Sequence, residues 1–194
     1  MAPSRAEQAA STRARLIAIA RELFATDGYA RTSIEAIQQR AAVSRGALYH
    51  HFANKRELFL AVYELVETET AQKIAAAAAN SPSASLRAGC AAWLELAGDP
   101  TTRQITLIDA PAVLGWESWS ATDDRRGLGL LRQALNREAQ TGHLDPDLVD
   151  GVAHVLLAAL IELGLMISRA PHAKTAQRHA QATLNYLLTR LLEP

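Results

Sequence analysis

The chain has 194 residues, of which 49% are hydrophobic, and its length and apolar content exclude a disordered or fibrous protein. It can bury a substantial core in one or two globular domains. Its 20 basic and 20 acidic residues are unevenly placed: residues 1–60 hold nine Arg or Lys against five Asp or Glu, and the remainder holds eleven against fifteen. A basic first part and an acidic second part fit a head that binds a polyanion.

Cysteine content and the N-terminus bear on the compartment. Cys90 is the single cysteine, so it cannot form an intramolecular disulfide, and it stands in no metal-ligand spacing. The first residues contain no apolar signal region, and we expect no later run to reach the roughly 18 apolar residues of a membrane span. These features predict a soluble cytoplasmic protein with no membrane association, no metal and no cofactor.

The first elements in chain order are an arm and a helix. Residues 1–11 are predicted to form a flexible N-terminal arm. A helix is expected from about Thr12 to Thr26, where apolar side chains recur at helical spacing. Gly28 is expected to end it at the C′ position.

Two short helices should follow in quick succession. Thr32 and Glu35 form a capping-box signature, which predicts a helix beginning at Ser33. Ser44 is the natural N-cap of the next helix, which should run to about His51. Two short helices joined by a tight turn indicate a helix-turn-helix.

Basic residues stand in the first turns of two helices, where acids would be expected. Asn54 should cap a helix that starts at Lys55, and Arg45 opens the helix after Ser44. Because the helix macrodipole disfavours cations at its N-terminus, something anionic should compensate them. Solvated surface cations would explain any one of them alone. Together, and beside Tyr49, they favour contact with phosphate. Helix N-termini bind phosphate, and Arg or Lys side chains strengthen that binding.

This block resembles the DNA-binding domain of the TetR family of transcriptional regulators. It contains, in order, a Thr/Ser-capped helix, a Ser-capped recognition helix, the run Leu-Tyr-His-His-Phe at 48–52 and a Lys-bearing helix start. The resemblance is specific over about residues 12–72. It implies an all-α protein with a three-helix helix-turn-helix DNA-binding domain over 12–56 and a larger helical ligand-binding and dimerisation domain over 57–194.

DNA contacts follow from matching the motif to this sequence. Arg45 is expected to read bases, because the residues after it in the recognition helix are small. Phosphate contacts from Thr32, Ser33, Tyr49, His50 and Lys55 should position the helix. The expected DNA-binding residues are Thr32, Ser33, Ser44, Arg45, Gly46, Ala47, Tyr49, His50 and Lys55.

The body is predicted to be helical throughout. The helix from Lys55 should continue to about Ala79 and link the two domains. The segment 100–121 is the least regular, with a short helix or turn expected over 112–119. The other expected helices are 83–97, 103–110, 122–140, a strongly apolar one after Asp145-Pro146 to Arg169, and 175–192.

Tryptophans gather in the irregular segment, which makes it a candidate wall of a small-molecule pocket. Ordinary core packing is the other interpretation, and it also applies to His154. A largely apolar or aromatic effector would suit such a pocket. The expected ligand contacts are Cys90, Trp93, Leu94, Leu107, Asp109, Val113, Trp116, Trp119, His154, Glu162 and Leu163.

The last two helices carry more apolar surface than one core requires, and the family resemblance implies that they pair with their copies in a homodimer. A two-fold dimer would read both half-sites of a palindrome. We therefore expect a DNA-binding regulator, a repressor that a small molecule releases from its operator. The alternative is a ligand-independent DNA-binding protein regulated through a protein partner. An enzyme is not expected, because no nucleotide-binding, metal-ligand or nucleophile motif is visible.

Overall fold

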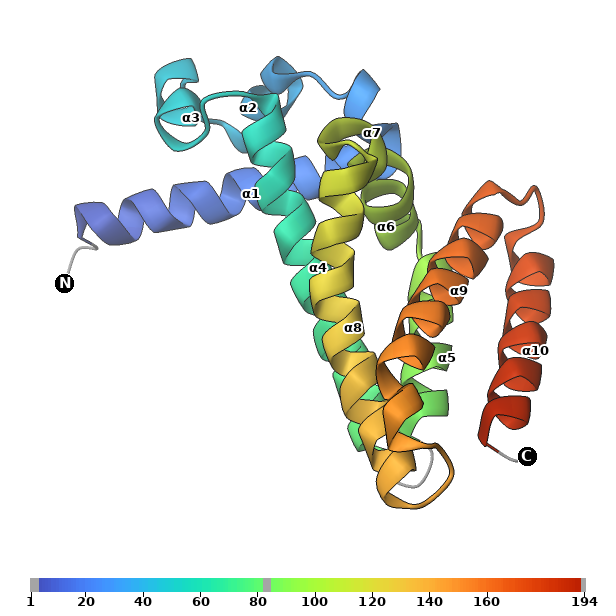
Figure 1. Cartoon of the computed structure of the whole chain (residues 1–194). Coiled ribbons are helices and arrows are strands. Elements are labelled where there is room, and N and C mark those ends of the chain that lie inside the picture. Colours follow the sequence, from blue (N-terminus) through green and yellow to red (C-terminus); the bar gives the residue numbers. More distant parts are fainter. Residues whose placement is uncertain (1–3, 82–84, 193–194) are drawn as a thin grey trace.

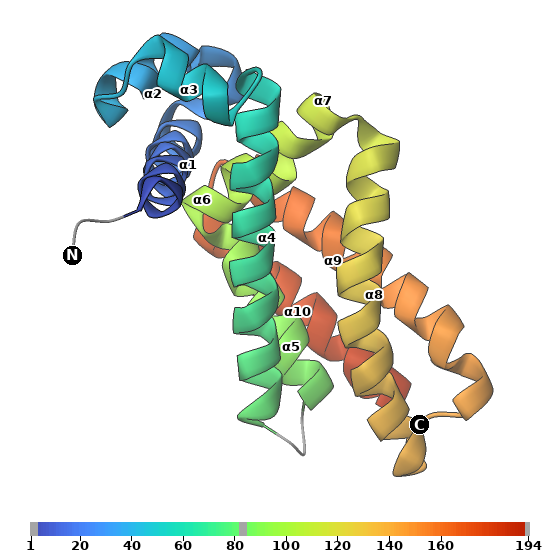
Figure 2. The same cartoon turned by 90° about the vertical axis from the view of Figure 1, so that its left-hand side faces the viewer.

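The structure, a computed structural model, describes residues 4–81 and 85–192, with the backbone alone for 116–118 and 120–126. Within those residues every regular element is a helix, which confirms the all-α prediction. Figures 1 and 2 show α1–α3 as a head at one end, with α4 running from the head along the body. The helices are α1 (Arg5–Arg31), α2 (Ile34–Ala41), α3 (Arg45–His51), α4 (Lys55–Ala79), α5 (Ser85–Gly98), α6 (Pro100–Thr102), η2 (Arg103–Asp109), α7 (Ala110–Leu114), α8 (Trp116–Gln140), η3 (Pro146–Leu148), α9 (Val149–Arg169) and α10 (Ala173–Leu192).

The first helix begins earlier than the sequence analysis predicts. Ser4 is the N-cap of α1, and its hydroxyl accepts a hydrogen bond from the Glu7 amide at 3.2 Å. The Glu7 carboxylate accepts from the Ser4 amide in return, which completes a capping box. The prediction of a flexible arm is therefore wrong from Arg5 onward, and residues 1–3 lie outside the described part.

The end of α1 and the start of α2 also differ from the prediction. Gly28 interrupts α1 with φ +80°, a conformation that favours glycine. Thr32 is 3% exposed, and its hydroxyl donates to the Gly28 carbonyl oxygen at 2.8 Å. Thr32 therefore closes the end of α1 and does not cap α2. Ser33 is the N-cap, accepting from the Ala36 amide at 3.0 Å.

The head has the predicted three-helix core. Rings of Phe24, Tyr29 and Phe59 lie 5.0–5.7 Å apart, centroid to centroid, and join α1 to the start of α4. The remaining core side chains come from the apolar faces of all three head helices, and they include Leu16, Ala20, Ile37, Leu48 and Phe52.

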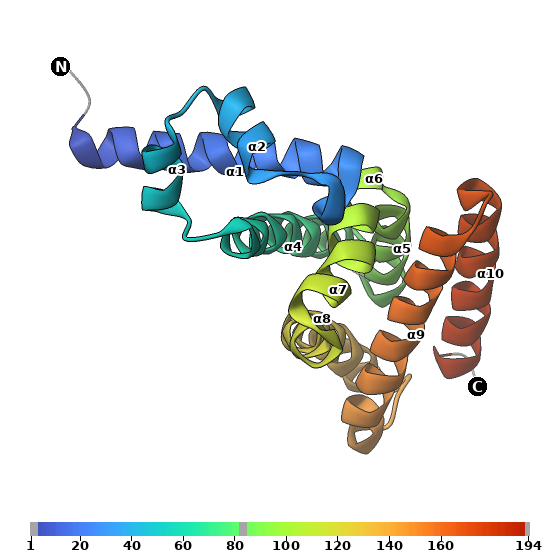
Figure 3. The same cartoon turned by 90° about the horizontal axis from the view of Figure 1, so that it is seen from above.

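The body packs α4 on α5, α5 on α9, α8 on α9, and α10 on α5 and α9. Figure 3 shows α9 and α10 side by side at the edge of the molecule away from the head. The predicted break near residue 120 is wrong, because α8 is continuous from Trp116 to Gln140. Between Trp116 and Arg126 the sequence contains neither Pro nor Gly, so nothing stops the helix.

The expectation that no later segment would be apolar enough to cross a membrane is also corrected. Residues Pro146–Arg169 are long and apolar enough by length and composition. In the fold this segment packs against α5, α8 and α10 as a body helix. Only 39% of its most apolar stretch is buried within the chain, so much of that surface faces outward.

Candidate functional site

The recognition helix α3 offers one open face. The Ser44 hydroxyl caps it by accepting from the Ala47 amide at 3.2 Å, while Leu48 is buried in the head core. The Arg45 guanidinium lies 5.6 Å from the centre of the Tyr49 ring. A Cβ added at Gly46 would meet no atom within 4 Å. The helix backbone is therefore open to close approach by a large partner.

Other predicted DNA contacts fall into two groups. His50 is exposed on α3, and Ser33 is exposed at the start of α2, where its hydroxyl serves as the N-cap. Thr32 is buried with its hydroxyl bonded inside the head, which is a poor position for a phosphate contact.

Lys55 is partly compensated within the protein. Its ammonium lies 4.1 Å from the centre of the Tyr29 ring. Partial burial lowers the pKa of Lys55, and the nearby Asp109 carboxylate opposes that shift. The Asp109 carboxylate, which belongs to the body, thus supplies part of the negative charge expected beside the start of α4.

Head and body meet at a junction around η2. Asp109 accepts a hydrogen bond from the Tyr29 amide at 2.8 Å, and the Arg56 guanidinium donates to the Val113 carbonyl oxygen at 3.3 Å. A Cβ at Gly28 would lie 3.0 Å from the Gln104 side-chain nitrogen, so the two elements approach closely there. Asp109 and Val113, which were predicted to line the ligand pocket, lie at this junction and are not among the residues that line the body cavity described next.

The body contains a cavity of about 150 Å³ between α4, α5, α8 and α9. Of the predicted ligand contacts, Cys90 and Trp93 line it. The Trp93 indole is fixed by donating to the Leu160 carbonyl oxygen at 3.1 Å. The lining residues are Glu67, Thr70, Ala71, Ile74, Ala75, Ala78, Ala79, Ser85, Leu86, Gly89, Cys90, Trp93, Gly127, Leu130, Leu131, Gln133, Ala134, Arg137, Leu157 and Leu160.

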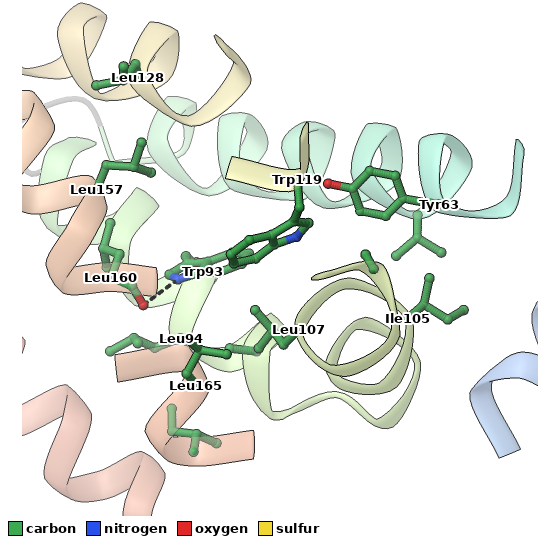
Figure 4. Close-up of a cluster of buried hydrophobic side chains, with 14 of the residues drawn as sticks. Tyr63, Trp93, Leu94, Ile105, Leu107, Trp119, Leu128, Leu157, Leu160 and Leu165 are labelled. Carbon is green, nitrogen blue, oxygen red and sulfur yellow. Dashed lines mark hydrogen bonds between the residues drawn. The ribbon is translucent and has the colours of Figure 1, made fainter. Parts of the chain in front are cut away.

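The remaining predicted ligand contacts lie elsewhere. Figure 4 shows Leu94, Leu107 and Trp119 in the buried cluster around Trp93, so the core-packing interpretation holds for them. The side chain of Trp116 lies outside the described part.

The predictions on α9 fail because these side chains point away from the cavity. His154 and Glu162 are exposed, and His154 Nδ1 lies 2.8 Å from the Asp150 carbonyl oxygen. Leu163 packs half-buried against the core without lining the cavity.

Sequence reasoning missed the α4 and α8 walls of the cavity. The alanine run 75–79 was the available signal, because small side chains on one helix leave space beside a neighbour. Glu67 was missed as well. It is 4% exposed, and its Oε1 accepts from the Thr106 hydroxyl at 3.0 Å.

The single cysteine of the chain lies in the cavity wall. Burial raises the pKa of the Cys90 thiol to about 12, so it stays protonated at neutral pH and is a poor nucleophile. Among the side chains that the structure describes, which leave out those of 116–118 and 120–126, no three His, Cys, Asp or Glu come together as a metal site.

Comparison with known proteins matches both parts of the chain. Residues 16–62 match the model of bacterial regulatory proteins of the tetR family, and residues 83–191 match a tetracyclin repressor-like C-terminal domain. The chain belongs to the TetR family of transcriptional regulators. Members of this family are DNA-binding regulators and not enzymes.

Individual relatives agree with the TetR assignment. The transcriptional regulator TtgR of Pseudomonas putida is 32% identical over 157 residues, covering 73% of this chain and 74% of that protein. The regulator AcrR of Shigella flexneri is 38% identical over 68 residues, but the matched part spans only 32% of its length.

Solved TetR structures extend the likeness to the whole fold. A TetR-family regulator from Pectobacterium atrosepticum superposes with a TM-score of 0.83 at 30% identity, over 99% of both chains. A complex of SmeT with triclosan superposes with a TM-score of 0.71 at 26% identity, over 93% of this chain and 91% of that one.

Proposed function

We propose that this TetR-family regulator is a cytoplasmic repressor that binds a palindromic operator as a homodimer and releases it when a small, largely apolar molecule enters the body cavity. The observation that carries the proposal is the cavity itself. It is lined mostly by apolar side chains and lies beside α4, the helix that begins in the head at Lys55. A ligand that favours one placement of α4 would shift the head between DNA-binding and released forms.

DNA binding is assigned to the exposed face of α3. Arg45, Tyr49 and His50 are exposed there, and the bare backbone at Gly46 permits close approach. We assign base reading to Arg45, because Arg pairs bidentately with guanine in the major groove. Phosphate contacts from the other exposed residues would fix its register.

The homodimer is assigned to the outer faces of α9 and α10. Val155 is 70% exposed and Tyr186 is 62% exposed, and Met166 and Leu187 add to the apolar surface of these two helices. Such a surface is costly in water unless a partner covers it. A two-fold pairing of α9 and α10 would cover it and place two recognition helices in successive major grooves, about 34 Å apart.

The proposal is tested by selecting an operator from a random DNA pool and measuring its affinity by fluorescence anisotropy. Val155→Glu should give a monomer by light scattering and lower operator affinity at least about 100-fold, because one head keeps only half of the contacts. His172→Glu is the matched control: His172 is exposed in the turn between α9 and α10, so this variant should remain dimeric. If Val155→Glu stays dimeric, the assigned interface is wrong.

A partner protein docking on the tryptophans is the alternative regulation. Trp93 and Trp119 are buried, so neither is available for such docking. The buried tryptophans and the cavity together favour regulation by a small molecule. The TetR-family neighbour SmeT was solved as a complex with triclosan, which supports small-molecule binding by this fold.

A further inference from the structure

One stripe of α4 lines the body cavity along half of that helix. The lining residues of α4 recur every three or four positions from Glu67 through Ala71 and Ala75 to Ala79, which is the spacing of one helix face. At 1.5 Å per residue this stripe is about 18 Å long. A cavity of about 150 Å³ spread along it is narrow. From Ala71 onward every lining side chain of α4 except Ile74 is alanine, so this wall suits a thin, unbranched chain.

The cavity opens at the end of the body away from the head. Figures 1 and 2 show the end of α4, the start of α5 and the end of α8 together there. Gln133 and Arg137 line the cavity one turn apart on α8, and both are exposed. Solvent therefore reaches the cavity beside these two side chains.

Two polar groups at this open end have no partner within the part of the chain that the structure describes. The Arg137 guanidinium makes no ion pair or hydrogen bond there, and the acid next to it, Glu138, lies 3.1 Å from His143 Nδ1. Ser85, the first residue of α5, lines the cavity with 2% of its surface exposed, and its hydroxyl makes no hydrogen bond to a described residue. A buried hydroxyl without a partner is costly, so this end of the cavity favours a ligand oxygen.

We propose that the effector is an elongated amphiphile, whose unbranched apolar chain lies along α4 and whose terminal carboxylate binds Arg137 and Ser85 at the open end. This inference rests on the proposed function of the cavity and names the chemical class of its ligand. A guanidinium binds a carboxylate through charge-assisted hydrogen bonds, and the Ser85 hydroxyl can donate one more. The acid Glu67 lies at the other end of the stripe, about 18 Å along the helix from Ala79. That separation exceeds the screening length of about 8 Å in physiological salt, so Glu67 does not oppose a carboxylate at the open end.

Four probes separate the chain, its shape and its charged end. Octanoate has the proposed form, 1-octanol and octylammonium change its end group, and 2-propylpentanoate is its branched isomer with the same charge. Dissociation constants are measured at neutral pH, on the full-length protein and below the micellar range, by tryptophan fluorescence and ligand-observed NMR. Trp93 lines the cavity and supplies the fluorescence signal.

Wild-type protein should bind octanoate about tenfold more tightly than octylammonium, with 1-octanol between them. It should also bind octanoate about tenfold more tightly than 2-propylpentanoate, because the branch does not fit a narrow cavity. Arg137→Gln should weaken octanoate about fivefold to tenfold and leave 1-octanol unchanged, and Ser85→Ala should weaken octanoate less. Arg132→Gln is the matched control: it makes the same charge change on α8, but Arg132 lies 2.7 Å from Asp150 and does not line the cavity, so octanoate binding should not change.

The outcomes that overturn this inference are specific. Equal affinity for octanoate and octylammonium, or an octanoate affinity that Arg137→Gln does not lower, would overturn the carboxylate assignment. Equal affinity for octanoate and 2-propylpentanoate would overturn the unbranched chain.

A blocked cavity separates this inference from the proposed function. At Gly89 an added Cβ would meet Ile74 at 3.6 Å, an ordinary contact, so the rest of a leucine side chain in Gly89→Leu can fill the space. This variant should lose binding of all four probes and keep operator binding, which shows that it folds. If other apolar compounds bind the wild-type cavity and release the operator while octanoate does not, the amphiphile assignment fails and the proposed function stands. If no compound binds wild-type protein that still binds operator, both proposals fail.

Discussion

The contact between Asp109 and the Tyr29 amide gives the sharpest test of how head and body are joined. Asp109→Ala removes the acceptor that lies 2.8 Å from that amide. A hydrogen bond to a charged group contributes about 1.5–3 kcal/mol, and because this pair is half-buried the lower value applies. We expect a loss of about 1.5 kcal/mol in the free energy of unfolding. Asp109→Asn keeps an oxygen acceptor but loses the charge, so it should lose about half as much.

Two measurements check this result. Urea unfolding at fixed protein concentration gives the free energies, and amide hydrogen exchange reports the Tyr29 N–H directly. Exchange at Tyr29 should accelerate in Asp109→Ala more than in Asp109→Asn. For a chain of this size, a loss of about 1.5 kcal/mol lowers the melting temperature by about 3–6 °C.

A matched control removes a carboxylate that bonds only within the body. Asp99 accepts from the amides of Thr101 and Thr102, each at 3.0 Å. Asp99→Ala should lose about 1 kcal/mol as a missing cap, with Tyr29 exchange unchanged. If Tyr29 exchanges at the wild-type rate in Asp109→Ala, the junction does not depend on this bond and the reasoning is refuted.

Three further predictions follow from single sites. Gly46→Ala should raise the free energy of unfolding by about 0.5–1 kcal/mol in thermal unfolding, because the added methyl meets no atom within 4 Å and alanine favours a helix. Gly46→Leu should fold normally, but its longer side chain should lower operator affinity at least about tenfold, as measured by fluorescence anisotropy. Burial raises the pKa of the Cys90 thiol from 9.0 to about 12. The buried neutral thiol therefore contributes its full stability below pH 9, and this contribution is lost as the pH rises toward 12. In urea titrations, Cys90→Ala should show a smaller loss of unfolding free energy between pH 9 and pH 12. Glu69→Gln should cost less than about 1 kcal/mol in urea unfolding, since its ion pair with Arg21 at 2.8 Å is about one-third exposed; a larger loss would show that this pair helps to hold α1 on α4.

The head was predictable because its signals are local. Ser44 and Asn54 cap α3 and α4 as the sequence indicates, and each cap depends on residues within three positions. Thr32 is the instructive failure. Its pattern with Glu35 fits a capping box, but Gly28 places the Thr32 hydroxyl against the end of α1, and Ser33 takes the cap.

The cavity was not predictable in the same way, because its walls come from four helices that span residues 55–169 and meet only in the folded chain. The tryptophans suggested the segment around Trp119, yet that side chain fills the core, and the space lies beside the alanine-rich half of α4. Large side chains indicate where a core is filled, whereas small ones decide where it stays open. Only the packing of α4 against its neighbours reveals which alanines face the cavity.

The π-helix η2 carries one contact to the cavity wall and one contact to the head. Its Thr106 bonds Glu67 in the cavity wall, and its last residue, Asp109, bonds Tyr29 in the head. The amide of Ala110 reaches back to the Ile105 carbonyl oxygen, so the wide turn spans the interval between them. A ligand that moved the cavity wall at Glu67 would therefore act on the same short segment that contacts the head. If coupling runs through η2, Asp109→Ala should reduce the fold-change in operator affinity caused by a cavity ligand, whereas Asp99→Ala should leave that fold-change unaltered.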